Sequence, residues 1–388
     1  MKRVITKGKV PVKLWLDDIE HGALEQALHL ADLPFIHKHV ATMPDAHQGY
    51  GMPIGGVIAL DNVVIPNAVG VDIGCGMCAV RTNLCDVSKE TLRKIRDRIK
   101  QTIPVGFHHH KEAQRLCHLP DTRECTEVIP REWASARKQV GTLGGGNHFI
   151  ELQRGSDGYL WAMIHSGSRN VGLKVAEYWN KEAVKLNERW ACSIPKSWGL
   201  AFLPLDSKQG QSYLAEMQWC VDFALMSRKH MMHAVLDILR EEIKPVGDMM
   251  TGFYNIAHNY AKVENHFGKD VVVHRKGATL ADEGTIGIIP GSQGTKSYIV
   301  EGLGNVQSFK SCSHGAGRIM SRAKAKDVLS LEEEQAKLDD QGILHDLRGR
   351  KALDEASGAY KDISVVMENQ SDLVRIRTEL TPLAVIKG

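Results

Sequence analysis

The apolar run at residues 54–80, IGGVIALDNVVIPNAVGVDIGCGMCAV, is interrupted throughout by glycine, asparagine and proline. Such interruptions end helices and are typical of short strands joined by turns. The run also carries Asp72, Cys75 and Cys78. A carboxylate between valine and isoleucine is costly to bury unless a positive group meets it. The segment therefore predicts adjacent strands that support a buried polar site.

Helices and strands are intermingled along the rest of the chain. Amphipathic patterns predict helices at 22–31, 88–103, 172–190 and 211–242. Alternating patterns predict strands at 10–15, on both sides of a hairpin turn at 155–158, at 270–278, at 296–304 and in the tail at 371–388, with a loop at 281–297. No regular strand–helix–strand repeat and no linker is present. The sequence predicts a single compact α+β domain over 1–388, with central β-sheets flanked by helices and glycine-rich active-site loops.

Composition places the chain among globular proteins of the cytoplasm. It is 43% hydrophobic and 24% charged, with a formal net charge of +3, which is too small to argue by itself for nucleic acid. No apolar run approaches the roughly 18 to 20 residues of a membrane span, and the N-terminus lacks the apolar stretch of a signal peptide. We therefore expect no membrane partner. The eight cysteines should be thiols or metal ligands.

Short clusters of glycine, histidine or both recur along the chain. Glycine permits close backbone approaches, and histidine is a common metal ligand and acid–base group. Taken together, the clusters predict loops that converge on one site for metal and phosphate, although any single cluster is equally explained as a turn with a surface histidine. They are MPDAHQGYGMPIGG (43–56), VGVDIGCGMC (69–78), GTLGGGNHFIE (141–151), MIHSGSRN (163–170), YNIAHNY (254–260), IIPGSQGTKS (288–297) and SCSHGAGR (311–318).

The Asp-x-x-Cys pattern of Asp72 and Cys75 can aim a hard oxygen and a soft sulfur at one place. Imidazoles from His148, His165 and His258 would complete two small coordination shells, and such mixed ligands suit Mn, Fe, Co or Zn better than Mg or Ca. The alternative is structural zinc on the C-x-x-C of Cys75 and Cys78. A second C-x-x-C is missing, since Cys117 and Cys125 are isolated, so Cys78 is expected to be a small core residue.

Two glycine-rich stretches, GGGNH and PGSQG, are typical of anion-binding loops, although neither matches the P-loop pattern. His314 lies in SCSHGAGR, four positions before Arg318, which is a natural phosphate clamp. Local sequence leaves three roles open for His314: metal ligand, base, or nucleophile forming a phosphoramidate.

From PFIHKHVATMPDAHQGYG to the terminal VIKG, the chain resembles the RtcB family of RNA ligases, which join RNA 3′-phosphate and 5′-hydroxyl ends in tRNA splicing and RNA repair. VGVDIGCGM, GNHFIE, HSGSR, PGS and SHGAGR occur in the order of the family. The resemblance implies a GTP- and Mn(II)-dependent ligase that accepts 3′-phosphate or 2′,3′-cyclic phosphate ends and forms a covalent histidine–GMP intermediate and an RNA 3′-guanylate.

The resemblance also assigns individual residues. It implies ligands for two Mn(II) ions at Asp72, Cys75, His148, His165 and His258, with Cys75 bridging, and the GMP-accepting nucleophile at His314. RNA-phosphate contacts fall on Arg169, Lys276 and Arg318. Guanylate-binding positions fall on Asn147, His148, Phe149, Ile150, Glu151, His258, Asn259, Pro290, Gly291, Ser292, Gln293, Ser297, His314, Gly315, Ala316, Gly317 and Lys387.

The sequence departs from the family at several places. Many members have a second histidine where this chain has Ala257, and a methionine where it has Gln293. The segment 108–131, with its HHH run, follows no family pattern and is expected to be a solvated loop. These departures suggest a divergent bacterial paralogue, expected to be a monomer.

Two other functions remain in view. A metal-dependent phosphodiesterase that only opens 2′,3′-cyclic phosphates would need the metal ligands but neither His314 as nucleophile nor Lys387. A non-catalytic RNA-binding protein would leave the ligand set unexplained. The physiological RNA, the metal used in the cell and any activating partner are not encoded in recognisable motifs.

Overall fold

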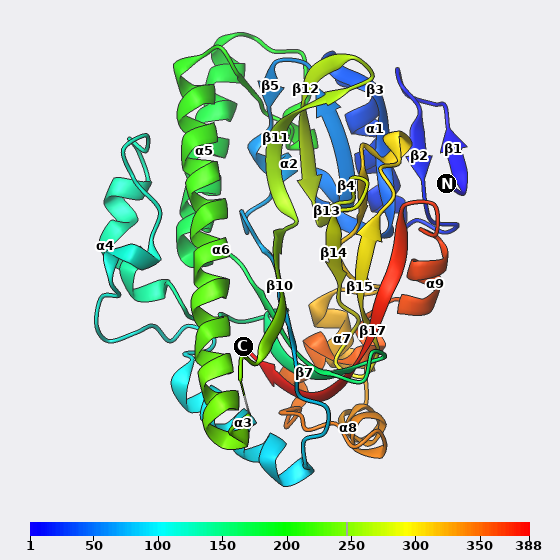
Figure 1. The fold of residues 1–388 in the computed structure, drawn as a ribbon. Coiled ribbons are helices and arrows are strands. Elements are labelled where there is room, and N and C mark those ends of the chain that lie inside the picture. Colours follow the sequence, from blue (N-terminus) through cyan, green and yellow to red (C-terminus); the bar gives the residue numbers. More distant parts are fainter. Residues whose placement is uncertain (246) are drawn as a thin grey trace.

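Two large β-sheets form the centre of the structure, a computed structural model that describes residues 1–245 and 247–388 (Figure 1). The first has the strand order β1 (Arg3–Ile5), β2 (Val12–Leu14), β3 (Ile36–Tyr50), β4 (Met52–Leu60), β12 (Lys269–Lys276), β11 (Asn259–His266). The second has the order β10 (Met250–Ala257), β6 (Gly76–Thr82), β8 (Leu160–Ser166), β7 (Phe149–Gly155), β17 (Val374–Lys387), β15 (Ser297–Gly302), β14 (Ile286–Ile289). Two small ribbons pair β13 (Ala278–Leu280) with β16 (Ser311–Ser313) and β5 (Val63–Val64) with β9 (Leu203–Pro204).

An apolar layer joins the two sheets. It contains Val57 of β4 and Val273 of β12 from the six-stranded sheet, and Ile289 of β14 and Val300 of β15 from the seven-stranded sheet. All four are fully buried. Burial of apolar surface between the sheets is the main favourable term that holds them together.

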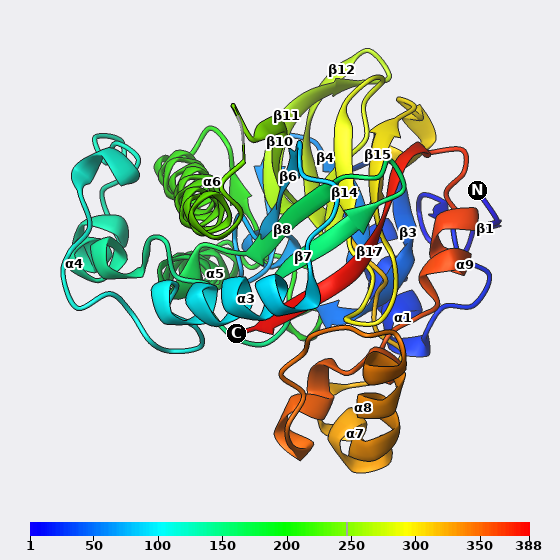
Figure 2. The same cartoon turned by 60° about the horizontal axis from the view of Figure 1, so that its bottom comes forward.

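Helices cover the outer faces of the sheets. α5 and α6 lie side by side along one flank, and α3 runs across the face formed by β7 and β17 (Figures 1 and 2). α6 begins at a capped end, because the Ser207 side chain accepts a hydrogen bond from the Gly210 amide. The helices are α1 (His21–Ala31), α2 (Pro66–Val69), α3 (Lys89–Thr102), α4 (Ile129–Gln139), α5 (Arg169–Arg189), α6 (Lys208–Ile243), α7 (Arg322–Val328), α8 (Leu331–Asp340) and α9 (Ile363–Glu368).

The central strands of the seven-stranded sheet have two chemically different faces. Met77, His165 and Phe149 are directly opposite one another across β6, β8 and β7 and so share one face. Cys78 and Ile164, one position away, share the other face and pack in the core below α3 and α6. Alternation along a strand therefore separates the face that carries His165, among apolar neighbours, from a purely apolar face.

The chain passes from one sheet to the other at His258. β10 ends at Ala257 in the seven-stranded sheet, and β11 begins at Asn259 in the six-stranded sheet. The His258 amide donates to the carbonyl of Cys75 at 2.8 Å, and its carbonyl accepts from Ala278 at 3.2 Å. Hydrogen bonds through both its amide and its carbonyl therefore fix the position of His258 at this junction.

The structure confirms the predicted α+β class, with central sheets flanked by helices. The expected helices at 22–31, 88–103, 172–190 and 211–242 correspond to α1, α3, α5 and α6, and the expected hairpin is formed by β7 and β8. No helix among the described residues is both long enough and apolar enough to cross a membrane.

Three expectations about secondary structure were wrong or incomplete. The supposed loop at 281–297 contains β14, whose short apolar run was masked by flanking glycines. The 54–80 segment contains not only strands but also the one-turn helix α2, which begins at Pro66. β3 was missed, because its irregular pairing with β4 interrupts the expected alternation.

Candidate functional site

Five side chains from segments far apart in the sequence form two triads that share one sulfur. Cys75, His165 and His258 make one triad, and Asp72, Cys75 and His148 make the other, with the possible ligand atoms of each triad within 4.8 Å of one another. The Cys75 Sγ atom is 3.5 Å from Nε2 of His148 and 3.3 Å from Nε2 of His165. Such an arrangement offers adjacent positions for two metal ions with sulfur between them.

Backbone carbonyls orient two of the imidazoles. Nδ1 of His148 lies 3.1 Å from the Leu143 carbonyl, and Nδ1 of His165 lies 3.1 Å from the Asn147 carbonyl. Each Nδ1 therefore carries the proton and donates it, which leaves the Nε2 lone pair facing the cluster. This is the usual outer hydrogen bond of a metal-binding histidine.

The charge states also fit a metal centre. Burial lowers the pKa of both His165 and His258 well below the usual value, so these rings are neutral near pH 7. Burial alone would raise the pKa of Asp72, but its contacts with His148 and Cys75 and the charge of Arg169 lower it to about 2. Burial and Asp72 raise the pKa of the Cys75 thiol, which only a cation would reverse. The mixed oxygen, nitrogen and sulfur donor set therefore fits a first-row divalent ion such as Mn(II) or Zn(II).

A buried arginine from α6 ties the ligand-bearing segments together. Nη1 of Arg228 donates to the carbonyls of Gly74 at 3.0 Å and Ser166 at 2.7 Å, and Nη2 donates to the carbonyl of Ile256 at 3.2 Å. Gly74 and Ser166 are each next to a cluster residue, and Ile256 is two positions before His258. Arg228 is fully buried, so its planar guanidinium fixes the spacing of the Gly74 loop and the strands β8 and β10 at once.

Cys78 does not join the cluster. It is fully buried in the apolar core, on the opposite face of β6 from Met77. Burial raises the pKa of its thiol to about 12. The described residues therefore provide no C-x-x-C site at Cys75 and Cys78.

His314 lies beside the cluster and is held by an aspartate of β3. Its Nδ1 atom is 2.6 Å from Oδ2 of Asp45, and the same oxygen accepts the backbone amides of His314 at 3.0 Å and Gly315 at 3.3 Å. The imidazole ring is 4.8 Å from that of His258. Because the buried carboxylate holds the proton on Nδ1, the Nε2 lone pair is free to act as a nucleophile.

Close packing at Gly277 leaves room for this imidazole. Gly277 has φ +60°, and a Cβ there would collide with Ile54 and lie 3.1 Å from the His314 ring. Its amide donates to the Asn259 side chain at 2.7 Å. A larger residue at 277 would displace the ring on which the site depends.

A cavity of about 160 Å³ opens in front of His314. It is bounded by segments of the glycine-rich clusters and by β7, β17 and the region after α8. Among the predicted positions, those that line it are Asn147, Phe149, Glu151, His165, Pro290, Gly291, Ser292, Gln293, His314, Gly315, Ala316, Gly317, Arg318 and Lys387.

Some predicted nucleotide positions lie behind the cavity wall. Ile150 faces the opposite side of β7 and packs in the apolar core. The Asn259 amide group donates to the Asp72 carbonyl at 3.0 Å, and Ser297 Oγ accepts the Gly291 amide at 3.2 Å. Asn259 and Ser297 therefore shape the loops from behind the wall.

Lys387 and Glu151 share the cavity wall on the paired strands β17 and β7. The Lys387 ammonium lies 5.5 Å from the centre of the Phe149 ring. Burial raises the pKa of Glu151 to about 8, and the nearby charge of Lys387 partly opposes this shift. Burial lowers the pKa of Lys387, while Glu355 and Glu151 oppose that change. This part of the cavity wall thus presents the Lys387 cation beside a carboxyl group, Glu151, that can accept or release a proton near neutral pH.

The three predicted RNA-phosphate residues lie in different environments. Arg318 lines the cavity and donates to the Asp354 carbonyl at 2.7 Å. Arg169 is tied between loops, with Nη2 donating to the Gly106 carbonyl at 3.2 Å. The Lys276 ammonium is buried against the carbonyls of Tyr50 at 2.6 Å and Asn67 at 2.9 Å, and burial lowers its pKa to about 7.

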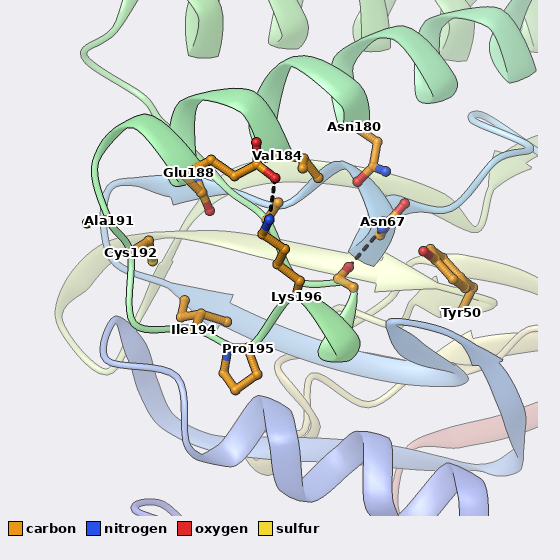
Figure 3. A pocket seen from close by; sticks show the side chains of 13 residues that line it. Tyr50, Asn67, Asn180, Val184, Glu188, Ala191, Cys192, Ile194, Pro195 and Lys196 are labelled. Carbon is orange, nitrogen blue, oxygen red and sulfur yellow. Dashed lines mark hydrogen bonds and ion pairs between the residues drawn. The ribbon is translucent and has the colours of Figure 1, made fainter.

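A second cavity, of about 480 Å³, lies between α5 and the loop that follows it (Figure 3). An ion pair at its wall, Lys196 to Glu188 at 2.5 Å, neutralises both charges. Asn67 donates across it to the Gly199 carbonyl at 2.8 Å. The histidines and the cysteine of the two triads do not line this cavity, so the chemistry belongs to the smaller one.

Two important residues were missed from the sequence. Asp45 was inside a recognised cluster, MPDAHQGYG, but nothing local indicated that it would meet His314, 269 positions away. Arg228 lies in an ordinary helical pattern, and nothing in that pattern indicated a role in the site. His148, His165 and His314 were found because they are embedded in glycine-rich motifs, whereas His258 was found in YNIAHNY, a motif without glycine.

Comparison with known proteins gives a consistent result over the whole chain. A family model described as tRNA-splicing ligase RtcB matches residues 26–136 and 120–388. The chain is 37% identical over 408 residues to the RNA-splicing ligase RtcB of Escherichia coli strain K12, covering 99% of both proteins. It is 32% identical over 459 residues to the tRNA-splicing ligase RtcB of Thermococcus kodakarensis, covering 98% of this chain and 95% of that one.

Proposed function

The chain belongs to the RtcB family and is an RNA ligase, and we propose that it joins RNA 3′-phosphate or 2′,3′-cyclic phosphate ends to 5′-hydroxyl ends by using GTP and Mn(II). The observation that carries the proposal is the position of His314, oriented by Asp45 and next to two triads that share Cys75. A phosphodiesterase would need the triads but would have no use for an oriented nucleophile.

Asp72, Cys75 and His148 would hold one Mn(II) ion, and Cys75, His165 and His258 the other. When bound, the ions would supply charge neutralisation at phosphate oxygens. Outer hydrogen bonds from His148 and His165 to backbone carbonyls support this role, because they keep Nε2 available.

His314 would attack the α-phosphorus of GTP through Nε2, with pyrophosphate leaving. Asp45 would stabilise the positive charge that the ring gains as the N–P bond forms. The RNA 3′-phosphate would then take GMP from His314, which turns a charged and unreactive end into a diphosphate with a good leaving group. Attack by the 5′-hydroxyl would form the new phosphodiester and release GMP.

The guanine ring would lie between Glu151 and Lys387. Its N1–H and amino group are donors that suit a carboxylate, and its O6 and N7 are acceptors that suit an ammonium. The Phe149 ring lies next to the Lys387 ammonium and adds an aromatic surface.

The purified protein provides a direct test. Incubation with α-labelled GTP and Mn(II) should give an acid-labile label on the protein, and RNA with 3′-phosphate and 5′-hydroxyl ends should then be joined. Opening of cyclic phosphates with no label and no joining would instead favour the phosphodiesterase.

Asp45→Asn should slow GMP attachment by a factor on the order of 10⁴, the loss found when the carboxylate that orients the catalytic histidine of a serine protease becomes an amide. An amide can donate to Nδ1 and so stabilises the wrong tautomer of His314. Metal content and the KM for GTP should change little, which separates this positioning role from misfolding. A rate of GMP attachment equal to that of the wild type would show that Asp45 is merely structural.

Lys387→Ala should weaken the use of GTP by about 1.5 to 3 kcal/mol, the usual contribution of a hydrogen bond to a charged group. The measurement is kcat/KM for GTP in the labelling reaction. Opening of a 2′,3′-cyclic phosphate should be spared, because that step needs no guanine. Lys181→Ala, on the exposed face of α5, is the control and should match the wild type. Equal kcat/KM in all three proteins would exclude Lys387 from guanine binding.

A further inference from the structure

Phe107 is the most exposed large apolar side chain among the described residues, at 101% of the fully exposed reference. The other large apolar side chains on the described surface reach at most 65% exposure. An aromatic ring of this size in contact with water on all sides is unfavourable in the free protein. The ring offers a flat, rigid apolar surface that a partner of matching shape can cover.

The backbone on either side of Phe107 is anchored. The Gly106 amide donates to the Gly144 carbonyl at 2.7 Å, and the Leu143 amide donates to the Pro104 carbonyl at 2.9 Å. The His108 amide donates to the Val105 carbonyl at 3.1 Å. The ring is therefore presented by a hydrogen-bonded turn attached to the loop that leads to His148.

The turn lies next to the proposed metal centre. Arg169 donates through Nη2 to the carbonyl of Gly106 at 3.2 Å, and its Nη1 atom is 3.5 Å from Nδ1 of His148. The Arg169 guanidinium therefore lies between Gly106, the residue before Phe107, and His148, a proposed metal ligand. Partial burial of His109 lowers its pKa, and the nearby charge of Arg169 lowers it further.

The surroundings of Phe107 are basic and aromatic. His108 and His109 follow it and are exposed, as are Lys111 and Arg115, against one acidic residue, Glu112. Proteins that bind single-stranded nucleic acid combine positive charge along the backbone path with rings on which bases stack. Bases inside a duplex cannot reach such a ring unless the duplex opens, whereas unpaired bases can be splayed out and stacked on it.

We propose that Phe107, together with His108 and His109, forms a stacking platform for an unpaired base of the RNA nucleotide beside the end that is joined. The inference rests on the proposed function, since it is the RNA end at the metal centre that brings a base to this turn. It also gives a role to the start of the 108–131 segment, which follows no family motif. The platform selects frayed or single-stranded ends over blunt duplex ends.

The test compares ligation of RNA by the wild type and by Phe107→Ala, Phe107→Trp and Leu116→Ala. Leu116 is 61% exposed in the same segment and serves as the matched control. Phe107→Ala should raise the KM for RNA at least about fivefold, the lower end of what one stacked base contributes. Phe107→Trp should restore the wild-type KM, and Leu116→Ala should keep it. An RNA that is abasic at the stacked nucleotide should bind the wild type and Phe107→Ala equally.

The outcomes separate this inference from the proposed function. GMP attachment in the absence of RNA reports on the nucleotide reaction alone. If labelling and ligation occur but Phe107→Ala has the wild-type KM for RNA, the platform is overturned and the proposed function stands. If the wild type shows neither labelling nor ligation, the proposed function fails. Equal affinity of the wild type and Phe107→Ala for single-stranded RNA, measured by fluorescence anisotropy, would then overturn the platform as well.

Discussion

After incubation with α-labelled GTP and Mn(II), the His314→Ala variant is expected to carry no covalent label, whereas the wild type carries an acid-labile one. Alanine has no nitrogen to form the phosphoramidate, and His165 and His258, the neighbouring rings, point their Nε2 atoms at each other at 3.4 Å. Ligation of RNA should be lost together with the label. Ligation of an RNA that already carries a 3′ guanylate should survive in part, because that step needs no attack by His314.

Metal content provides the internal control for this variant. His314 is outside both triads, so His314→Ala should bind as much Mn(II) as the wild type. His233→Ala, an exposed histidine of α6, should keep both label and metal. A covalent label retained by His314→Ala would remove His314 from the mechanism.

Cys75→Ser should lose most of the bound metal, because Cys75 is the only residue common to the two triads of the described structure. A metal-bound thiol ionises readily, whereas the hydroxyl of serine stays protonated near pH 7. Metal analysis after gel filtration, together with titration calorimetry, measures the loss. GMP attachment should fall in parallel.

Cys78→Ser is the matched control, since it makes the same atomic change three positions further along. Its side chain lies in the apolar core, where a hydroxyl without a partner destabilises the fold by about 1 to 3 kcal/mol. Metal content should remain close to that of the wild type, while the melting temperature falls. Equal metal loss in both variants would instead support a C-x-x-C site.

The different fates of these two cysteines could be predicted from strand geometry alone. Cys75 precedes the strand GMCAV, whereas alternation within that strand places Cys78 on the apolar face opposite to Met77 and away from the cluster. The residues His148, His165 and His258 were likewise predictable, because each lies in a short motif of a recognisable family. Cysteine and histidine in such motifs have few roles other than metal binding or catalysis.

The residues that orient the site could not be predicted. Arg228 meets Gly74, which is 154 positions away, and Asp45 meets His314 across 269 positions. Such contacts depend on how the sheets and α6 pack, and local sequence patterns do not encode that packing. β14 was missed for a related reason, since pairing with β15 outweighs the turn-forming preference of its neighbouring glycines.

The proposed nucleophile and most of the proposed ligands lie in different halves of the fold. His314 is fixed by Asp45 of the six-stranded sheet, whereas His165 is carried by the seven-stranded sheet. Their alignment therefore depends on how the sheets slide over the apolar layer between them. A slip of about 1 Å can slow a reaction about 10²-fold without removing any catalytic group. Substitutions deep in that layer, at Val57 or Val300, can thus produce a slow enzyme with full metal content and an intact nucleophile.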